Sequence, residues 1–122
     1  MDLNISNKQI GDVSVVALRG RIVLGEGSSA LRERVKNLVG DGKKKIVLNM
    51  TNVRYIDSAG LGALVAAHVS AKKEGAALLL SDLGTKFHEV MQVTRLLTVF
   101  NVFDTEAEAI SSFDVTKQAA TA

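Results

Sequence analysis

The segment Asp57-Ser58-Ala59-Gly60-Leu61-Gly62 combines a carboxylate, a hydroxyl and two glycines in one short stretch. A buried strand over residues 46–50 is predicted before it, and an amphipathic helix from about 58 to about 74 after it. The backbone N–H groups at a helix start favour negative charge, and Asp57 or Ser58 can accept one of their hydrogen bonds. The segment therefore predicts either a helix cap alone or a position at which Ser58 carries a phosphate.

Gly60 and Gly62 fall in the first turn of the predicted helix. Each glycine there costs roughly 1 kcal/mol relative to alanine, so we expect a compensating reason for both. One reason is the close approach of another backbone, from within the fold or from a partner. Another is a flat patch with few side chains beside an exposed Ser58.

Ser58 could also be the nucleophile of a hydrolase, which requires a base within hydrogen-bond reach. His68 lies ten residues along the same predicted helix, about 15 Å away at 1.5 Å per residue. His88 could approach only through the tertiary fold. The motifs Gly-x-Ser-x-Gly and Gly-x-x-x-x-Gly-Lys-Ser/Thr are both absent. Serine hydrolysis is therefore disfavoured.

Phosphorylation is the better chemical role for Ser58. A phosphate adds roughly −1.5 to −2 charges and three acceptor oxygens. Next to Asp57 it would turn a weakly charged patch into a strongly anionic one, which is enough to expel a docked partner. The simpler alternative is that Asp57 or Ser58 serves only as the helix cap, and the residues by themselves favour that alternative.

The predicted elements that position this segment form one α/β domain. Two extended segments, 3–10 and 13–18, flank Gly11-Asp12 and predict an antiparallel hairpin. Helical patterns then alternate with buried strands, and Thr105 with Glu108 forms a capping box before the last helix. The order predicts a mixed, mostly parallel β-sheet with an N-terminal antiparallel hairpin, flanked by about four helices. We assign residues 1–115 to the domain and residues 116–122 to a frayed C-terminal tail.

Composition excludes several classes of function. Fifteen Lys and Arg against thirteen Asp and Glu give a net charge of +2, too small to argue for a nucleic-acid surface. The chain has no cysteine and two histidines, so we expect no metal site and no cofactor. No apolar run approaches the roughly 18 residues that a membrane span needs. We therefore expect a cytoplasmic protein without membrane insertion.

Residues 55–64, Tyr-Ile-Asp-Ser-Ala-Gly-Leu-Gly-Ala-Leu, resemble the signature of the STAS family, which comprises anti-sigma factor antagonists and related domains of sulfate transporters. Three further regions fall where the family has similar segments: residues 16–20, residues 46–50, and residues 96–100 before 105–109. The resemblance covers nearly the whole chain. These segments together are more specific than the motif alone.

The resemblance implies a small switch that catalyses nothing itself. Its unmodified form would bind an anti-sigma factor that is also a serine kinase, and so free a sigma factor for transcription. Phosphorylation at Ser58 would release it, a phosphatase would reset it, and any ATP would belong to the partner. The residues that shape the contact would be Asp57, Ser58, Ala59, Gly60, Leu61 and Gly62. An unpaired sheet edge or the patch around Leu61 could also support a weak homodimer.

Two charged residues outside the motif are further candidates for this site. Many antagonists carry an acidic residue where this chain has Val23, and Glu26 in the following glycine-flanked loop could substitute for it. Arg95 falls in a loop expected near the motif and could neutralise a phosphate on Ser58; the alternative is a solvated arginine. Ala59 stands where the family commonly has a second hydroxyl, so Ser58 is the phosphorylation candidate.

Another role within the same family also fits the sequence. A STAS module can serve as a regulatory or scaffold subunit of a stress-signalling assembly, or of a lipid or anion transporter, in which Ser58 is never phosphorylated.

Overall fold

The computed structural model describes residues 3–93, 95 and 99–121. Five strands in these residues form one sheet in the order β1-β2-β3-β4-β5. β1 pairs with β2 antiparallel, and the remaining pairs are parallel. The elements are β1 Leu3–Ile10, β2 Val13–Ile22, α1 Glu26–Gly40, β3 Lys45–Ile56, α2 Ser58–Lys73, β4 Ala77–Ser81, α3 Thr85–Val93, β5 Asn101–Phe103 and α4 Glu106–Thr121. The predicted α/β domain with a mixed sheet, an opening hairpin and four helices is confirmed.

The opening hairpin turns through two residues, as its sequence predicts. Ile10 pairs with Val13, which leaves Gly11 and Asp12 as the loop. Gly11 has φ +60°, a conformation that favours glycine and that suits the twist of the two strands. Parallel pairing then requires crossover connections, and α1, α2 and α3 supply them.

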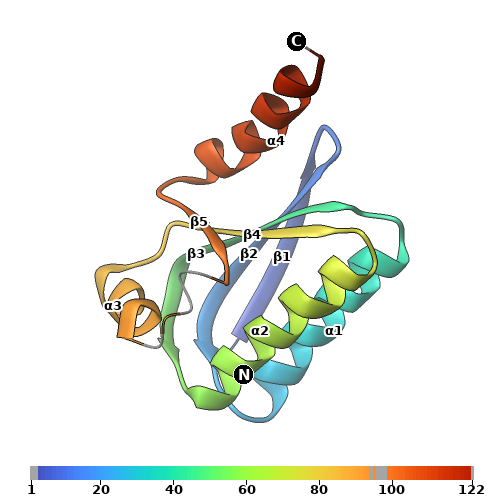
Figure 1. Cartoon of the computed structure of the whole chain (residues 1–122). Helices are drawn as coiled ribbons and strands as arrows, with labels where there is room; N and C mark the ends of the chain where they lie inside the picture. The colour runs from blue at the N-terminus through green and yellow to red at the C-terminus, as the bar shows by residue number, and fades with distance from the viewer. Residues whose placement is uncertain (1–2, 94, 96–98, 122) are drawn as a thin grey trace.

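Helices cover both faces of the sheet (Figure 1). α1 and α2 pack together against one face, where Val16, Leu18 and Leu48 belong to the larger hydrophobic core. Val15 and Val47 point to the opposite face and pack with Ala109 of α4. The alternation of buried residues along β2 thus supplies two cores, as expected for a strand with both faces covered.

β3 is longer than the strand predicted over residues 46–50, because two β-bulges extend its pairing with β2. Ala17 pairs with Asn49 but Arg19 pairs with Asn52, so one residue is inserted on β3. Gly20 then pairs with Val53 and Arg21 with Tyr55, which inserts Arg54. A bulge breaks the two-residue alternation on which strand prediction depends. β3 therefore continues through Ile56, directly to the start of α2.

Thr105 caps α4 as predicted, but Glu108 bonds to the hydroxyl of Thr105 and not to its backbone N–H as in a complete capping box. The backbone N–H of Glu108 donates to Thr105 Oγ1 at 3.1 Å, and the hydroxyl of Thr105 donates to Glu108 Oε1 at 3.2 Å. α4 continues to Thr121, through most of the segment predicted to fray, and extends away from the sheet (Figure 1). The domain boundary at residue 115 stays a prediction. None of the helices that the structure describes is long and apolar enough to cross a membrane.

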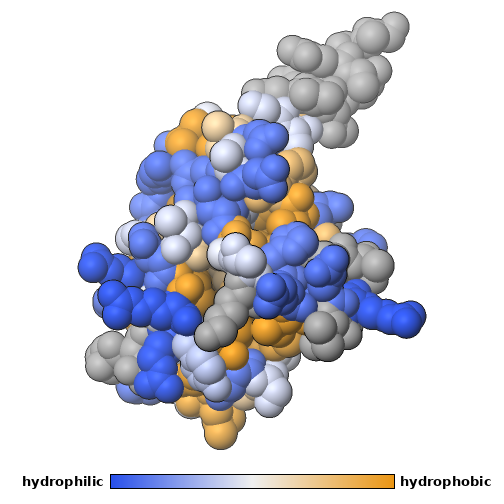
Figure 2. All heavy atoms as spheres, turned by 90° about the vertical axis from the view of Figure 1, so that its left-hand side faces the viewer, coloured by the Kyte–Doolittle hydropathy of each residue, from blue (hydrophilic) through white to orange (hydrophobic). Residues whose placement is uncertain are grey.

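The side of the molecule at the left of Figure 1 is mostly hydrophilic. Figure 2 shows charged and polar side chains projecting from both flanks of this side, with smaller hydrophobic areas between them and at its lower end. Large exposed hydrophobic residues are few in the described chain, and the most exposed of them is Leu24 at 78%.

Candidate functional site

Asp57 is the residue that caps α2. Its backbone is extended (φ −100°, ψ −177°), and its Oδ1 accepts a hydrogen bond from the N–H of Gly60 at 2.7 Å. One of the free N–H groups at the helix start is therefore satisfied by Asp57, so the hydroxyl of Ser58 is not required for capping. The sequence left the choice between Asp57 and Ser58 open.

The second carboxylate oxygen of Asp57 holds a loop that is distant in the sequence. Asp57 Oδ2 accepts from the backbone N–H of Leu24 at 3.1 Å, and the backbone N–H of Asp57 donates to the carbonyl of Ile22 at 3.3 Å. The N–H groups of Gly60 and then Leu24 stabilise the ionised carboxylate, which lowers the pKa of Asp57 below its ordinary value. Asp57 thus joins the ends of β2 and β3 to the start of α2 and remains negatively charged.

Gly60 is explained by the close approach of another part of the fold. A Cβ atom at Gly60 would lie 1.9 Å from the carbonyl oxygen of Ile22 and 2.9 Å from Cγ1 of Ile56. A side chain cannot occupy that space without a shift of the backbone. Gly62 is different, since it is exposed and a Cβ there would meet nothing within 4 Å. The close approach of another backbone therefore accounts for Gly60, and the explanation of Gly62 by a flat patch beside Ser58 stays a prediction.

Ser58 is the first residue of α2 and is exposed. Among the residues that the structure describes, no side chain or backbone group forms a hydrogen bond with its hydroxyl. Ala59 is half-buried, and Leu61 is half-buried against the larger core, with its N–H donating to the carbonyl of Asp57 at 2.9 Å. The segment therefore presents Ser58 and Gly62 to solvent and uses Asp57, Gly60 and Leu61 to fix the helix start.

Glu26 lies at the same end of the sheet as Ser58, because the loop before it is bound to Asp57. It is the first residue of α1 and is exposed. Ser28 fixes the loop from the other side, with its hydroxyl donating to the carbonyl of Val23 at 2.7 Å. The helix starts of α1 and α2 are thereby held next to each other. Whether Glu26 contacts a partner stays a prediction.

Sequence reasoning missed two exposed hydrophobic residues beside this site. Leu24 lies in the loop bound to Asp57, and Tyr55 is 53% exposed two residues before Asp57. The exposure of Leu24 could have been predicted, because Leu24 stands between a strand and a glycine-rich loop where no predicted element can bury it. Tyr55 could not be found in this way, since its exposure depends on the second β-bulge.

Arg95 follows α3 in the sequence, and His68 lies within α2. Arg95 is exposed in the turn after α3, with φ +63°, and its role toward a phosphate stays a prediction. The half-buried His68 packs against Phe100, with 5.2 Å between the ring centroids. Burial lowers the pKa of His68, and the charge of Lys72 lowers it further. His68 thus belongs to a packed region of α2.

A groove of about 860 Å³ runs between α1 and α2. Small residues of α2 and charged residues of α1 line it, including Ala66, Ala67 and Ser70 from the former and Arg32 and Lys36 from the latter. None of the predicted site residues lines this groove. No cluster of three or more metal-ligating residues occurs in the part of the chain that the structure describes.

Comparisons with known proteins agree with this architecture. The family model for the STAS domain matches residues 4–109. The anti-sigma F factor antagonist of Paenibacillus polymyxa is 21% identical over 115 residues, covering 94% of this chain and 98% of the relative. The anti-sigma-B factor antagonist of Bacillus subtilis is 28% identical over 102 residues, covering 84% of this chain and 92% of the relative.

Solved structures of the Bacillus protein SpoIIAA have a similar fold. Its unphosphorylated form has a TM-score of 0.70 at 18% identity, covering 91% of this chain and 98% of SpoIIAA. Its phosphorylated form has a TM-score of 0.69 at 18% identity, covering 90% and 99%. Since the family model spans most of the sequence and the solved structures have a similar fold, the chain belongs to the STAS domain family.

Proposed function

We propose that this protein is an anti-sigma factor antagonist whose binding is controlled by phosphorylation at Ser58. The unphosphorylated protein binds an anti-sigma factor that also has serine kinase activity. That kinase phosphorylates Ser58 and releases the protein, and a phosphatase restores it. The protein acts in the cytoplasm and regulates sigma-factor-dependent transcription by binding, not by catalysis.

One observation carries the proposal: the helix cap and the candidate phosphate acceptor are different residues. Asp57 caps α2 and binds the loop at Leu24, whereas the exposed hydroxyl of Ser58 forms no hydrogen bond with any of the residues that the structure describes. A kinase can therefore modify Ser58 without removing a hydrogen bond that the fold needs. The relatives named as anti-sigma factor antagonists, and the SpoIIAA structures in both forms, support the same role.

The surface beside Ser58 is suited to an apolar contact. Leu24, at 78% exposed, and Tyr55, at 53%, flank the segment, and the exposed Gly62 adds no side chain to it. Large hydrophobic side chains of this kind act as anchors when a partner buries them away from water.

A phosphate on Ser58 would oppose such burial. It would place a dianion next to the Asp57 carboxylate, which stays ionised because its pKa is lowered. Burying two adjacent negative charges without cations is strongly unfavourable. The modified site would therefore have to remain hydrated, and the partner would dissociate.

The proposal can be tested by affinity capture from the native lysate with wild type, Ser58→Ala and Ser58→Asp as baits. Ser111→Asp is the matched control, because Ser111 is an exposed serine on α4, on the other side of the sheet. Wild type, Ser58→Ala and Ser111→Asp should retain an anti-sigma factor with a kinase domain, and Ser58→Asp should lose it.

Phosphosite mapping of the captured protein completes the test. Phosphate on Ser58, removed by phosphatase treatment with recovery of binding, is the expected result. Equal capture by all four baits, together with an unmodified Ser58, would contradict the proposal. That result would favour the alternative of a STAS scaffold or transporter subunit that works without phosphorylation.

A further inference from the structure

β1 is an edge strand of the sheet, and no strand in the described chain pairs with its outer side. The other edge strand, β5, has three residues, whereas β1 has eight, Leu3–Ile10. Short edges are poor templates for pairing, but a row of unpaired backbone groups along a strand as long as β1 can bind another strand.

The register of the opening hairpin shows which backbone groups of β1 face outward. In a hairpin with a two-residue loop, the residues that flank the loop form a hydrogen-bonded pair, and such pairs then alternate with non-hydrogen-bonded ones. Counting from Ile10 and Val13, the even-numbered residues of β1 direct their N–H and C=O groups to β2. The odd-numbered residues direct theirs outward: Leu3, Ile5, Asn7 and Gln9. No other segment that the structure describes forms backbone hydrogen bonds with these outward groups.

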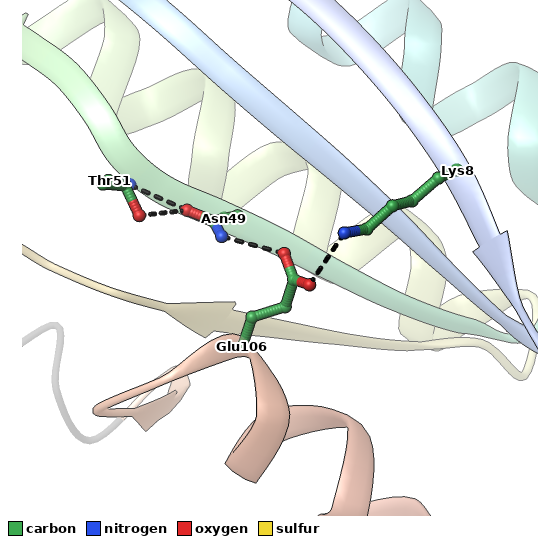
Figure 3. Close-up of polar contacts among 4 residues, drawn as sticks. All are labelled: Lys8, Asn49, Thr51 and Glu106. Atoms are coloured by element: carbon green, nitrogen blue, oxygen red, sulfur yellow. Dashed lines mark hydrogen bonds and ion pairs between the residues drawn. The ribbon is translucent and has the colours of Figure 1, made fainter.

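β1 lacks the features that commonly protect a sheet edge from pairing. The chain has no proline, and β1 pairs with β2 without a bulge. The one charged residue of β1 is Lys8, whose Nζ pairs with Glu106 of α4 at 3.1 Å. Figure 3 shows the Lys8 side chain extending over the sheet towards Glu106. The charge of Lys8 is therefore drawn away from the edge, where it would oppose an approaching strand.

We propose that β1 pairs antiparallel with β1 of a second copy of this protein, about a two-fold axis that passes through Ser6. Leu3 then lies opposite Gln9 of the second copy. Ile5 lies opposite Asn7 in the same way. This register pairs all four outward residues of each copy, and a shift in either direction leaves some of them unpaired.

The side chains of β1 agree with a two-fold axis at Ser6. Ser6 meets its own counterpart there, and two hydroxyls can form a hydrogen bond across the strands. Lys8 lies opposite the uncharged Asn4, so no like charges face each other directly. A register that placed Lys8 opposite Lys8 would bring two ammonium groups together and leave Leu3 and Ile5 unpaired.

A second copy is favoured over an unrelated protein because the strand complements itself in length, backbone pattern and charge. One pair of strands is a small interface, so we expect a weak dimer with a Kd of roughly 10 μM to 1 mM. The proposal does not depend on phosphorylation of Ser58.

The test uses the position of Ser6 on the two-fold axis. Ser6 is exposed, so Ser6→Lys and Ser6→Glu should both fold, which urea unfolding verifies. Each variant alone places two like charges opposite each other and should weaken self-association at least about tenfold. An equal mixture of the two variants places opposite charges at the axis and should restore dimers. Sedimentation velocity from about 10 μM to about 1 mM measures the dimer fraction.

Ser70→Lys and Ser70→Glu are the matched controls. Ser70 is an exposed serine of α2, on the face of the sheet opposite to the Ser6 side chain. These variants should change the dimerisation constant by less than about twofold, alone or mixed.

Amide hydrogen exchange gives a second, residue-specific readout. Exchange of the outward N–H groups of Ile5, Asn7 and Gln9 should slow as the protein concentration rises. Exchange at Ser6 and Lys8 should change less, because their N–H groups already face β2.

Three results would overturn the proposal. One is a wild type that stays monomeric over the whole concentration range, which would leave the edge of β1 to a strand of another protein. Another is a dimer that the Ser6 variants weaken no more than the Ser70 variants do, because its contact would then lie elsewhere. The third is a mixture of Ser6→Lys and Ser6→Glu that stays monomeric. Since these measurements involve neither a kinase nor Ser58, their outcome is independent of the test of the phosphorylation switch.

Discussion

The carbonyl oxygen of Ile22 occupies the space that a side chain on Gly60 would need, with only 1.9 Å between that oxygen and the ideal Cβ position. This contact sets how closely the start of α2 approaches the end of β2. It also explains why a residue with poor helix propensity lies in the first turn of the helix, next to the candidate phosphate acceptor.

Replacement of Gly60 by alanine should strongly destabilise the fold. The added methyl group overlaps backbone atoms that belong to β2, so either the strand end or the helix must move. We expect a loss of about 2 kcal/mol or more in the free energy of unfolding, measured by urea titration. Gly62→Ala is the control, because its Cβ meets nothing within 4 Å, and it should raise stability by about 0.5–1 kcal/mol. Equal stabilities of the two variants would show that the carbonyl of Ile22 does not exclude a side chain at position 60.

The contribution of Asp57 to stability should depend on pH. Because its pKa is lower in the folded than in the unfolded protein, the ionised carboxylate stabilises the fold above its ordinary pKa of 3.8. This stabilisation is lost as the pH falls below that value, through the lower folded pKa. Asp57→Ala should therefore be less stable than wild type at neutral pH, with the difference shrinking in acid. Thermal unfolding across a pH series measures it, and a difference that stayed constant down to the lowest pH would contradict this account.

Around Glu106, Asn49 should matter more for stability than Lys8. Asn49 donates to Glu106, and its side-chain oxygen accepts from the backbone N–H of Thr51 at 2.9 Å, within the first β-bulge (Figure 3). Lys8 forms an ion pair with Glu106, but its side chain is 60% exposed. We expect a cost of about 1–2 kcal/mol for Asn49→Ala and less than about 0.5 kcal/mol for Lys8→Ala.

Salt separates these two contributions. The effect of Lys8→Ala should disappear at about 1 M salt, whereas the effect of Asn49→Ala should persist, because an ion pair is screened and a hydrogen bond to the backbone is not. Urea unfolding at low and at high salt measures the loss in the free energy of unfolding for each variant. A larger loss for Lys8→Ala than for Asn49→Ala would reverse this ranking.

Leu24 should affect partner binding without affecting stability. At 78% exposure its side chain contributes little to the core, so Leu24→Ser should change the free energy of unfolding by less than about 0.5 kcal/mol. Its affinity for the captured anti-sigma partner should fall by about tenfold or more, as for an apolar interface anchor. Val69→Ser is the control, because Val69 is 51% exposed but lies further along α2. Similar losses of affinity for both variants would place the interface elsewhere on the surface.

Local patterns were sufficient to predict much of the fold. The Gly11-Asp12 turn and the cap of α4 by Thr105 depend on residues close together in the sequence, and both are as predicted. The short helix α3 shows where such patterns are insufficient, because Phe87 and Met91 are buried whereas the equally apolar Val90 is 38% exposed.

The features that sequence patterns did not reveal are contacts between distant segments. The Asp57–Leu24 hydrogen bond joins residues 33 positions apart, and the Gly60–Ile22 contact spans a similar interval. The two β-bulges change which residues of β3 face solvent, and so determine the exposure of Tyr55 and Arg54. Residue types alone therefore indicated where the candidate site lies, but not which residues surround it.

The two oxygens of the Asp57 carboxylate each bind a separate segment of the chain, while the hydroxyl of the neighbouring Ser58 binds none of the segments that the structure describes. If Ser58 is the phosphorylation site that we propose, phosphate can be added and removed there without breaking either of the Asp57 hydrogen bonds. The free energy of unfolding would then be nearly the same in the phosphorylated and unphosphorylated states.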